Sequence, residues 1–219
     1  MQRYPDRHAA GKVLAQGLAA LAGHPDAVVL ALPRGGVPVG FAIAQALKLP
    51  LDIVLVRKLG VPGNEEYAMG AVASGGARVM QPDVVEMLGI EPIVVEAIVE
   101  RELRTIAQRE QSYRAGRAPL PLAAKIVILA DDGLATGSTM RVAVEVVRQQ
   151  GPQCIILAVP VGAPDSLAAF EGLVDEIACP CTPMVFRAVS QWYDDFSETS
   201  DEEVCQLLER ASAAPYASM

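Results

Sequence analysis

The sequence lacks the features that mark membrane, secreted and disulfide-stabilised proteins. Its longest apolar runs, near residues 27–33 and 154–164, contain Pro or Gly and fall short of the ~18–20 residues that a membrane-spanning helix needs. The first residues, MQRYPDRHAAGK, include no apolar segment of the kind found in secretory signal peptides. Four cysteines in 219 residues are too few for a disulfide scaffold. We therefore expect a cytoplasmic protein that does not enter a membrane.

Several kinds of functional site are also disfavoured. The only two histidines, His8 and His24, lie near the start of the chain and offer little material for a histidine metal site or a Ser/His/Asp triad. No G-x-G-x-x-G follows the first expected strand and no G-x-x-x-x-G-K-[ST] occurs, which argues against a dinucleotide-dependent oxidoreductase and a P-loop nucleotidase. The net charge of −8, from 18 basic and 26 acidic residues, disfavours general nucleic-acid binding, because phosphates attract basic surfaces.

Aliphatic residues are abundant instead. Hydrophobic residues make up 52% of the chain and aromatic residues only 5%, a balance typical of parallel strands buried between helices. Short apolar runs alternate with helical segments, which predicts an α/β fold with an open, doubly wound, mostly parallel sheet and flanking helices. In such sheets, ligands bind beyond the carboxyl ends of the strands. The expected strands cover residues 27–33, 51–56, 125–130, 155–159 and 174–178, and the expected helices cover residues 6–22, 37–48, 83–88, 92–115, 138–150, 165–170 and a final segment that opens at Ser200.

Between the second and third of these strands the pattern changes. Residues 59–67 contain Gly, Pro and Glu and are predicted to form a mobile loop. Residues 69–73 and 77–80 predict a hairpin around Ser74-Gly75-Gly76. We expect a single domain over residues 1–219.

The most informative segment is residues 126–139, IVILADDGLATGST. A buried strand is followed by two acids, a loop of small residues and the start of a helix. The loop of residues 135–139 exposes backbone N–H groups at a helix N-terminus, which is a natural anion site. Asp131 and Asp132 would repel a phosphate, but they are suited to accept hydrogen bonds from sugar hydroxyls or to face Mg²⁺ through water. This arrangement predicts a site for a sugar phosphate.

The same segment resembles the phosphoribosyl-pyrophosphate (PRPP) signature of type I phosphoribosyltransferases. That pattern is a run of aliphatics, two acids, two aliphatics and then small residues ending in T-G-x-T. Gly133 departs from it, because the family usually has an aliphatic residue there. The residues that match are Asp131, Asp132, Leu134, Ala135, Thr136, Gly137 and Thr139.

Two further loops fit the resemblance. Type I members bind pyrophosphate with a short loop after the first core strand, which corresponds here to Arg34, Gly35 and Gly36 after Pro33. They also carry a basic, flexible loop after the second strand that closes over the reacting centre. Arg57-Lys58, followed by LGVPGNEEYAMG, is similar in position and looks most like the loop of adenine-type enzymes.

The resemblance implies transfer of ribose 5-phosphate from PRPP to a nitrogenous base or amine, with release of pyrophosphate. Asp131 and Asp132 would bind the ribose hydroxyls, and Mg²⁺, held chiefly through PRPP, would offset charge on the pyrophosphate. The resemblance covers about residues 27–178, which form the approximate core of the expected domain. It also implies a homo-oligomer, as a dimer, and a variable hood, which residues 1–23, 83–117 and 179–219 would form together with flanking helices. The residues expected to bind the 5′-phosphate are Ala135, Thr136, Gly137, Ser138 and Thr139. Those expected to bind the pyrophosphate are Arg34, Gly35, Gly36 and Lys58. The residues expected to take part in catalysis are Lys58, Arg57, Asp131 and Asp132.

The acceptor stays open at this point. Ala135 stands where members acting on 6-oxopurines usually have an Asp, which argues against a hypoxanthine/guanine activity of that type. Val161, Gly162 and Trp192 follow late strands and are expected near the acceptor, although Trp192 could instead anchor the tail. The alternative function is a non-catalytic regulator that senses PRPP or a nucleotide, but the Arg57-Lys58 pair favours an enzyme.

Overall fold

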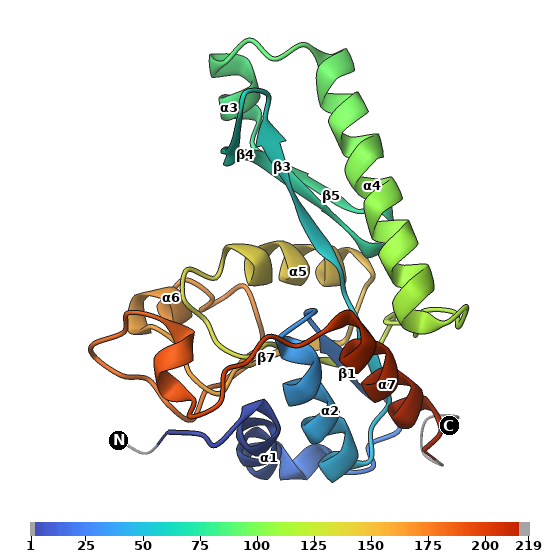
Figure 1. Ribbon diagram of the computed structural model, residues 1–219, viewed down its shortest axis with the longest axis vertical. Helices are drawn as coiled ribbons and strands as arrows, with labels where there is room; N and C mark the ends of the chain where they lie inside the picture. Colours follow the sequence, from blue (N-terminus) through green and yellow to red (C-terminus); the bar gives the residue numbers. More distant parts are fainter. Residues whose placement is uncertain (1–2, 215–219) are drawn as a thin grey trace.

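The computed structural model describes residues 3–214, and its centre is a parallel sheet in the strand order β2-β1-β6-β7-β8 (Figure 1). The paired registers are regular: β1 (Ala27–Ala31) pairs with β6 (Ile126–Ala130), and β6 pairs with β7 (Cys154–Ala158). The expected α/β class, with flanking helices, is confirmed. The outer strands are β2 (Leu51–Ile53) and β8 (Glu176–Ala178).

Alternate residues of the parallel strands belong to two separate hydrophobic clusters, one on each face of the sheet, because successive side chains of a strand point to opposite faces. On one face, Val29 and Ile128 pack with residues of α1 and α2. On the other, Val28 and Leu129 pack with residues of α5 and α6. The helices on the two faces are α1 (Arg7–Gly17), α2 (Gly36–Leu47), α5 (Ser138–Gln149) and α6 (Pro164–Ala168).

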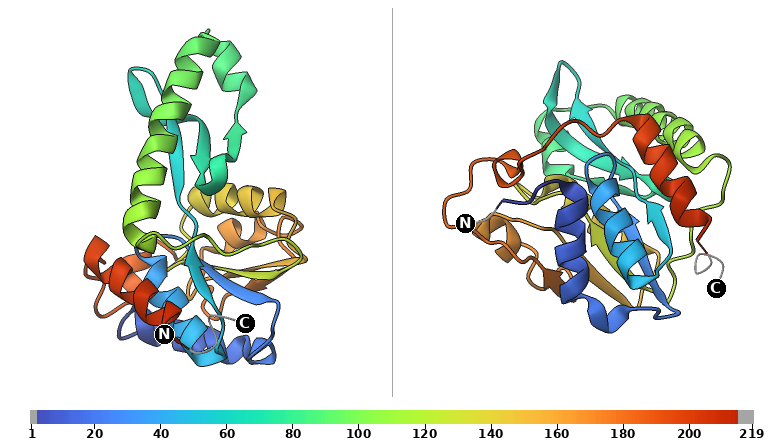
Figure 2. Two further views of the ribbon diagram at one scale, coloured as in Figure 1. Left: turned by 90° about the vertical axis from the view of Figure 1, so that its right-hand side faces the viewer. Right: turned by 60° about the horizontal axis from the view of Figure 1, so that its bottom comes forward.

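A second, antiparallel sheet projects from this core, as Figures 1 and 2 show. It consists of β3 (Val56–Val61), β4 (Asn64–Ala73) and β5 (Arg78–Met80). Two helices complete this projecting lobe, α3 (Pro82–Met87) and α4 (Pro92–Arg114). The lobe therefore spans residues 56–114, and its base packs against α5 of the core.

The lobe corrects two expectations about residues 51–67. The expected strand over residues 51–56 ends at Ile53, and the chain then enters the other sheet. Residues 59–67, expected to form a mobile loop, belong to the β3–β4 hairpin. A glycine permits the close pairing of its two strands, since a Cβ atom at Gly60 would lie 2.7 Å from Glu65 Cα. The hairpin between residues 69–73 and 77–80 is confirmed as β4 and β5.

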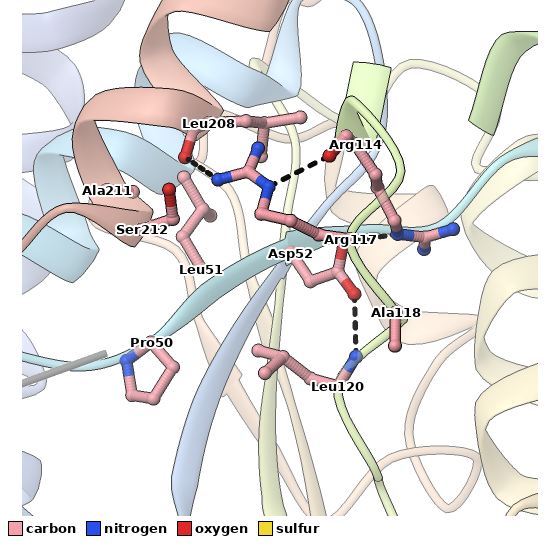
Figure 3. Close-up of a pocket in the computed structure, with 10 residues that line it drawn as sticks. All are labelled: Pro50, Leu51, Asp52, Arg114, Arg117, Ala118, Leu120, Leu208, Ala211 and Ser212. Atoms are coloured by element: carbon pink, nitrogen blue, oxygen red, sulfur yellow. Dashed lines mark hydrogen bonds and ion pairs between the residues drawn. The ribbon is translucent and has the colours of Figure 1, made fainter. Parts of the chain in front are cut away.

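The lobe is tied to the core by a buried ion pair, drawn in Figure 3. Arg114, at the end of α4, donates from Nε to Asp52 Oδ1 of β2 over 2.8 Å, and each side chain is only 8% exposed. Arg114 also donates to the carbonyl oxygen of Ile53 over 2.9 Å. The pair borders a cavity of about 250 Å³ between β2, the chain after α4 and the final helix α7 (Asp201–Ser212).

The three segments expected to form the hood lie in different places. Residues 83–117 supply most of α3 and all of α4, so they belong to the lobe. Helix α1 packs on α2 of the core, and α7 packs against both α2 and α4. The chain between β8 and α7, residues 179–200, is an irregular tail that contains the 3₁₀ helix η3 (Val189–Trp192). Two further 3₁₀ helices, η1 (Ala19–Leu21) and η2 (Ser74–Gly76), lie elsewhere in the chain. Within residues 3–214, no helix combines the length and apolar character needed to cross a membrane.

Candidate functional site

Two loops meet where the strand order reverses, between β1 and β6, which is the usual ligand position of an open α/β sheet. A Cβ atom at Gly36 would lie 2.7 Å from the carbonyl oxygen of Ala130 and 3.0 Å from Asp131 Cα. A Cβ atom at Gly35 would overlap Asp132 Oδ2. Only residues without a side chain fit this approach, so the fold brings together the predicted glycine loop and the predicted acid pair.

The two acids are largely desolvated. Asp131 Oδ1 accepts a hydrogen bond from the backbone N–H of Asp132 over 2.9 Å. Burial, together with the neighbouring Asp132 carboxylate, raises the pKa of Asp131 well above its ordinary value. Burial also raises the pKa of Asp132, although a hydrogen bond from Arg7 opposes the shift. Buried carboxylates of this kind require hydrogen-bond donors, and sugar hydroxyls would supply them.

Arg7 is part of the site, and the sequence reasoning missed it. Its Nε donates to Asp132 Oδ2 over 2.9 Å. From the other side, the Tyr193 hydroxyl donates to the main-chain oxygen of Asp132 over 2.6 Å. Arg7 is 125 positions from Asp132 and belongs to no recognisable motif, so no local signal could have found it.

The predicted phosphate loop lies between β6 and the N-terminus of α5. Gly137 has a φ of +73°, which favours glycine, and a Cβ atom there would lie 2.7 Å from the ring of Phe170. The Ser166 hydroxyl donates to the carbonyl oxygen of Ala135 and so braces the loop from α6. The residues Thr136, Ser138 and Thr139 are exposed, as a ligand-binding loop requires.

Arg34, the cation of the glycine loop, is paired with the tail and α7. It donates to a carboxylate oxygen of Glu198, and its guanidinium lies 3.7 Å from Asp201 Oδ1. These groups are exposed, with 40% of the Arg34 side chain and 76% of the Glu198 side chain accessible. Two carboxylates therefore face the loop that the sequence predicts to bind pyrophosphate.

Arg57 and Lys58 lie on β3 of the lobe, opposite Val72 and Ala71 of β4. The Arg57 Nε donates to Glu102 Oε2 of α4 over 2.9 Å, and Glu102 Oε1 accepts from Arg101 over 3.0 Å. Burial alone would raise the pKa of Glu102, but these two arginines outweigh burial and lower it. Arg57 thus joins β3 to α4. Lys58 is exposed, and as the next residue along the strand it faces the other side of the sheet.

The candidate acceptor residues occupy tightly packed loops. Val161 is fully buried, and its carbonyl oxygen accepts from the N–H of Leu134 over 2.9 Å. The Gly162 N–H donates to the carbonyl oxygen of Cys181 over 3.1 Å. Trp192 has a buried indole N–H without a hydrogen-bond partner among residues 3–214, while its carbonyl oxygen accepts from the N–H of Tyr4. Val161 and Gly162 therefore hold neighbouring loops together, and Trp192 connects the tail to the start of the chain. Their expected place near the acceptor stays a prediction.

The departure from the signature at Gly133 has a steric reason. A Cβ atom at Gly133 would lie 2.6 Å from Val189 Cγ1 and 3.2 Å from Val161 Cγ1. The tail therefore fills the space that an aliphatic side chain would take at this position. Among residues 3–214, no group of three or more His, Cys, Asp or Glu side chains could hold a metal ion by itself.

Comparison with known proteins gives a consistent result. A family model described as a phosphoribosyl transferase domain matches residues 5–180. Two Mycobacterium tuberculosis relatives, from strains CDC 1551 and H37Rv, carry the name "Putative phosphoribosyl transferase"; each is 44% identical over 211 residues, which are 96% of this chain and 47% of the relative. The chain thus spans about half the length of these curated relatives. The crystal structure of TT1426 from Thermus thermophilus is similar with a TM-score of 0.83 and 38% identity, over 95% of this chain and 99% of that one.

Proposed function

The chain belongs to the phosphoribosyl transferase family, and from that membership we propose that it transfers ribose 5-phosphate from PRPP to a nitrogenous base or amine and releases pyrophosphate. One observation carries the proposal. Gly35 and Gly36, which have no side chains, lie against Asp131 and Asp132, so the loop predicted to bind an anion adjoins the acids predicted to bind a sugar. Helix α5 begins at Ser138, at the end of the loop that follows the same acids.

Residues of the site divide between the parts of PRPP. The loop of residues 135–139 would bind the 5′-phosphate through backbone N–H groups and hydroxyls at the N-terminus of α5. Asp131 and Asp132 would accept hydrogen bonds from the ribose hydroxyls. The backbone of Gly35 and Gly36, with Arg34, would bind the pyrophosphate. Positioning and charge stabilisation of an oxocarbenium-like transition state would then account for most of the catalysis.

Mg²⁺ is part of the proposal. Its preferred ligands are oxygens, and the carboxylates of Asp131 and Asp132 are suitable in chemistry to face it through water. One oxygen of each carboxylate already accepts a hydrogen bond, Asp132 Oδ2 from Arg7 and Asp131 Oδ1 from a backbone N–H. Because these oxygens are engaged, the arrangement supports an ion held chiefly by PRPP. When bound, it supplies charge neutralisation on the departing pyrophosphate.

The lobe would supply the remaining charge. Lys58 would contact the pyrophosphate as the lobe approaches the core, and this approach would exclude water so that PRPP is not hydrolysed. Arg57 would act from a fixed place, because its guanidinium pairs with the buried Glu102. Members that act on 6-oxopurines usually bind the base through an Asp at the position of Ala135. Because this chain has Ala there, the acceptor would be a different base or an amine. We also propose a homodimer, which light scattering on the purified protein would test.

A second candidate function is a sensor that binds PRPP or a nucleotide without catalysis. The observation that favours it is the pairing of both predicted pyrophosphate-side arginines with carboxylates of the protein, Arg34 with Glu198 and Arg57 with Glu102. A sensor would bind PRPP but release no pyrophosphate with any base or amine.

The test is calorimetric titration with PRPP, with and without Mg²⁺, with ribose 5-phosphate and NAD as comparison ligands. We expect micromolar, Mg²⁺-dependent PRPP binding and weaker binding of ribose 5-phosphate. The test variant is the double substitution Asp131→Asn with Asp132→Asn, which preserves the shape of both side chains. We expect it to bind PRPP at least about tenfold more weakly than the unaltered protein. Unchanged binding by a folded double variant, or no PRPP binding by the unaltered protein, would overturn the proposal. A screen of bases and amines for pyrophosphate release then separates enzyme from sensor.

A further inference from the structure

Arg7 opens α1 and forms one wall of the site. The pair that it makes with Asp132 is largely shielded from water, with 11% of the Arg7 side chain and 16% of the Asp132 side chain exposed. A Cβ atom at Gly35 would lie 3.3 Å from Arg7 Nε, so the glycine loop contacts the same pair. An ion pair in this position is less screened than one on the open surface.

The tail fixes the guanidinium of Arg7. One terminal nitrogen, Nη1, donates to the carbonyl oxygen of Ser197 over 2.7 Å. The guanidinium carbon lies 3.9 Å from the ring centre of Phe196 and 6.0 Å from that of Tyr193, which are distances of cation–π attraction. A planar group held by a carbonyl, an aromatic face and a carboxylate has one orientation.

Asp132 is fixed in the same way. Arg7 occupies its Oδ2, and the Tyr193 hydroxyl holds its main-chain oxygen. The backbone N–H of Asp132 donates to Asp131 Oδ1. Within residues 3–214, these contacts leave Asp132 Oδ1 as the oxygen that can accept a hydrogen bond from a ribose hydroxyl.

Resting on the function proposed above, we propose that Arg7 is a positioning residue for PRPP, which aims Asp132 Oδ1 at a ribose hydroxyl and offsets the charge of the adjacent acids as the anionic substrate enters. Arg7 acts through Asp132 and does not touch the reacting atoms. Its electrostatic effect is visible on both acids, because its charge opposes the rise in pKa that burial causes at Asp131 and Asp132.

Separate ligands for the two ends of PRPP distinguish this role from others. Ribose 5-phosphate contains the hydroxyls that Asp132 would bind, whereas inorganic pyrophosphate does not. A positioning role predicts that Arg7→Gln weakens the binding of PRPP and ribose 5-phosphate about tenfold. Pyrophosphate affinity should fall by no more than about two- to threefold, as expected from the loss of one positive charge. A role in folding alone predicts a lower melting temperature with all three affinities retained.

The matched control is Arg3→Gln, which makes the same change of charge four positions earlier in the chain. Arg3 pairs with Asp194 over 3.9 Å on the open surface, with the two side chains 58% and 63% exposed, so its loss is expected to change none of the three affinities. Arg7→Lys keeps the charge but not the planar donor fork, and we expect it to restore part of the lost ribose 5-phosphate affinity.

A double-mutant cycle connects Arg7 to Asp132. If Arg7 acts through Asp132, adding Arg7→Gln to Asp132→Asn causes little further loss of ribose 5-phosphate binding. Full additivity, an equal loss of pyrophosphate binding, or unchanged binding by a folded Arg7→Gln protein would each overturn the assignment while the proposed function stands. Absence of PRPP and ribose 5-phosphate binding in the unaltered protein would overturn the proposed function itself.

A second variant covers the case in which Arg7→Gln does not fold. Phe196→Leu keeps the ion pair but removes the aromatic face beneath the guanidinium. We expect the same ligand pattern with a smaller loss, about two- to threefold. Equal affinities for ribose 5-phosphate in Phe196→Leu and the unaltered protein would contradict the positioning role.

Discussion

In the parallel core, the charged site residues predicted from the sequence lie on loops after the strands, whereas in the projecting lobe they lie on a strand, β3. Asp131 and Asp132 follow β6 and meet the glycine loop that follows β1. Arg57 lies within β3 and pairs across the lobe with Glu102 of α4. A charge that follows a parallel strand lies at the edge of the sheet where ligands bind, even where it also has a partner, as Arg34 has Glu198. Arg57, within the antiparallel sheet, has its partner on the neighbouring helix.

This difference determines how far the geometry of the sheet supports each predicted group of site residues. The end of a parallel strand at a reversal of strand order is a ligand position for geometric reasons. The same geometric argument does not apply to a basic pair if the chain continues into a second sheet, as it does after Ile53, so the role of Arg57 and Lys58 stays a prediction. The comparison predicts that damage to the lobe acts on stability and on turnover, and damage to the core loops on substrate binding.

The largest expected effect is at the junction of the two regions. Asp52→Ala removes one of the two carboxylates that pair with the buried Arg114, while Glu110 stays within 2.5 Å of its guanidinium. The free energy of unfolding should fall by about 2–3 kcal/mol, because one buried donor loses its acceptor. Urea denaturation measures the change. The control is Asp26→Ala, which removes an exposed pair with Lys125 and should cost less than about 1 kcal/mol. Similar losses in both variants would show that the junction does not hold lobe and core together.

The next effect tests whether the lobe takes part in the chemistry. Lys58→Ala should lower kcat about tenfold and change PRPP affinity by less than about threefold, because its charge would act on the departing pyrophosphate. Steady-state kinetics with the acceptor found by screening measures both. Arg78→Ala, which removes an exposed pair with Glu96 on the same lobe, should leave kcat unchanged. An unchanged kcat in Lys58→Ala would restrict the lobe to a structural role.

A smaller effect is expected in the core, where replacing a proposed ligand-binding acid should make the protein more stable. Because burial raises the pKa of Asp131, ionisation of this carboxyl costs more in the folded than in the unfolded protein. This cost is absent at a pH below the ordinary carboxyl pKa and grows as the pH rises towards the folded value. Asp131→Asn should therefore raise Tm by a few degrees at pH 7, with little gain under acid conditions. Calorimetric scans across pH measure this, and a gain that is constant with pH would contradict it.

The smallest effect concerns the tail. Glu198→Gln removes an exposed partner of Arg34 and should strengthen binding of inorganic pyrophosphate about two- to fivefold, as expected for a surface ion pair. The control is Glu202→Gln, which makes the same charge change at an exposed position in the first turn of α7. Titration at low and high salt should show the gain at low salt, because salt screens exposed pairs. An equal gain in both variants would indicate a general charge effect.

Much of the fold could be predicted from local patterns. The helix starts at Asp6 and Ser200 are confirmed, since each side chain accepts a hydrogen bond from the N–H three residues on. The antiparallel lobe could not be foreseen in full, because residues 59–67 carry the composition of a loop. Their pairing as strands depends on β4 and on packing against α4.

The sequence by itself determined the parallel core and the loops at its switch point, because apolar runs, helix starts and small-residue turns act over a few neighbouring positions. Only the tertiary structure decided which charges are free to meet a ligand. Arg7 reaches Asp132 across 125 positions and Arg34 reaches Glu198 across 164. Such pairs form because the fold brings distant chain segments within hydrogen-bond distance, and electrostatic attraction depends on separation in space and on burial, neither of which is written in the local order of residues.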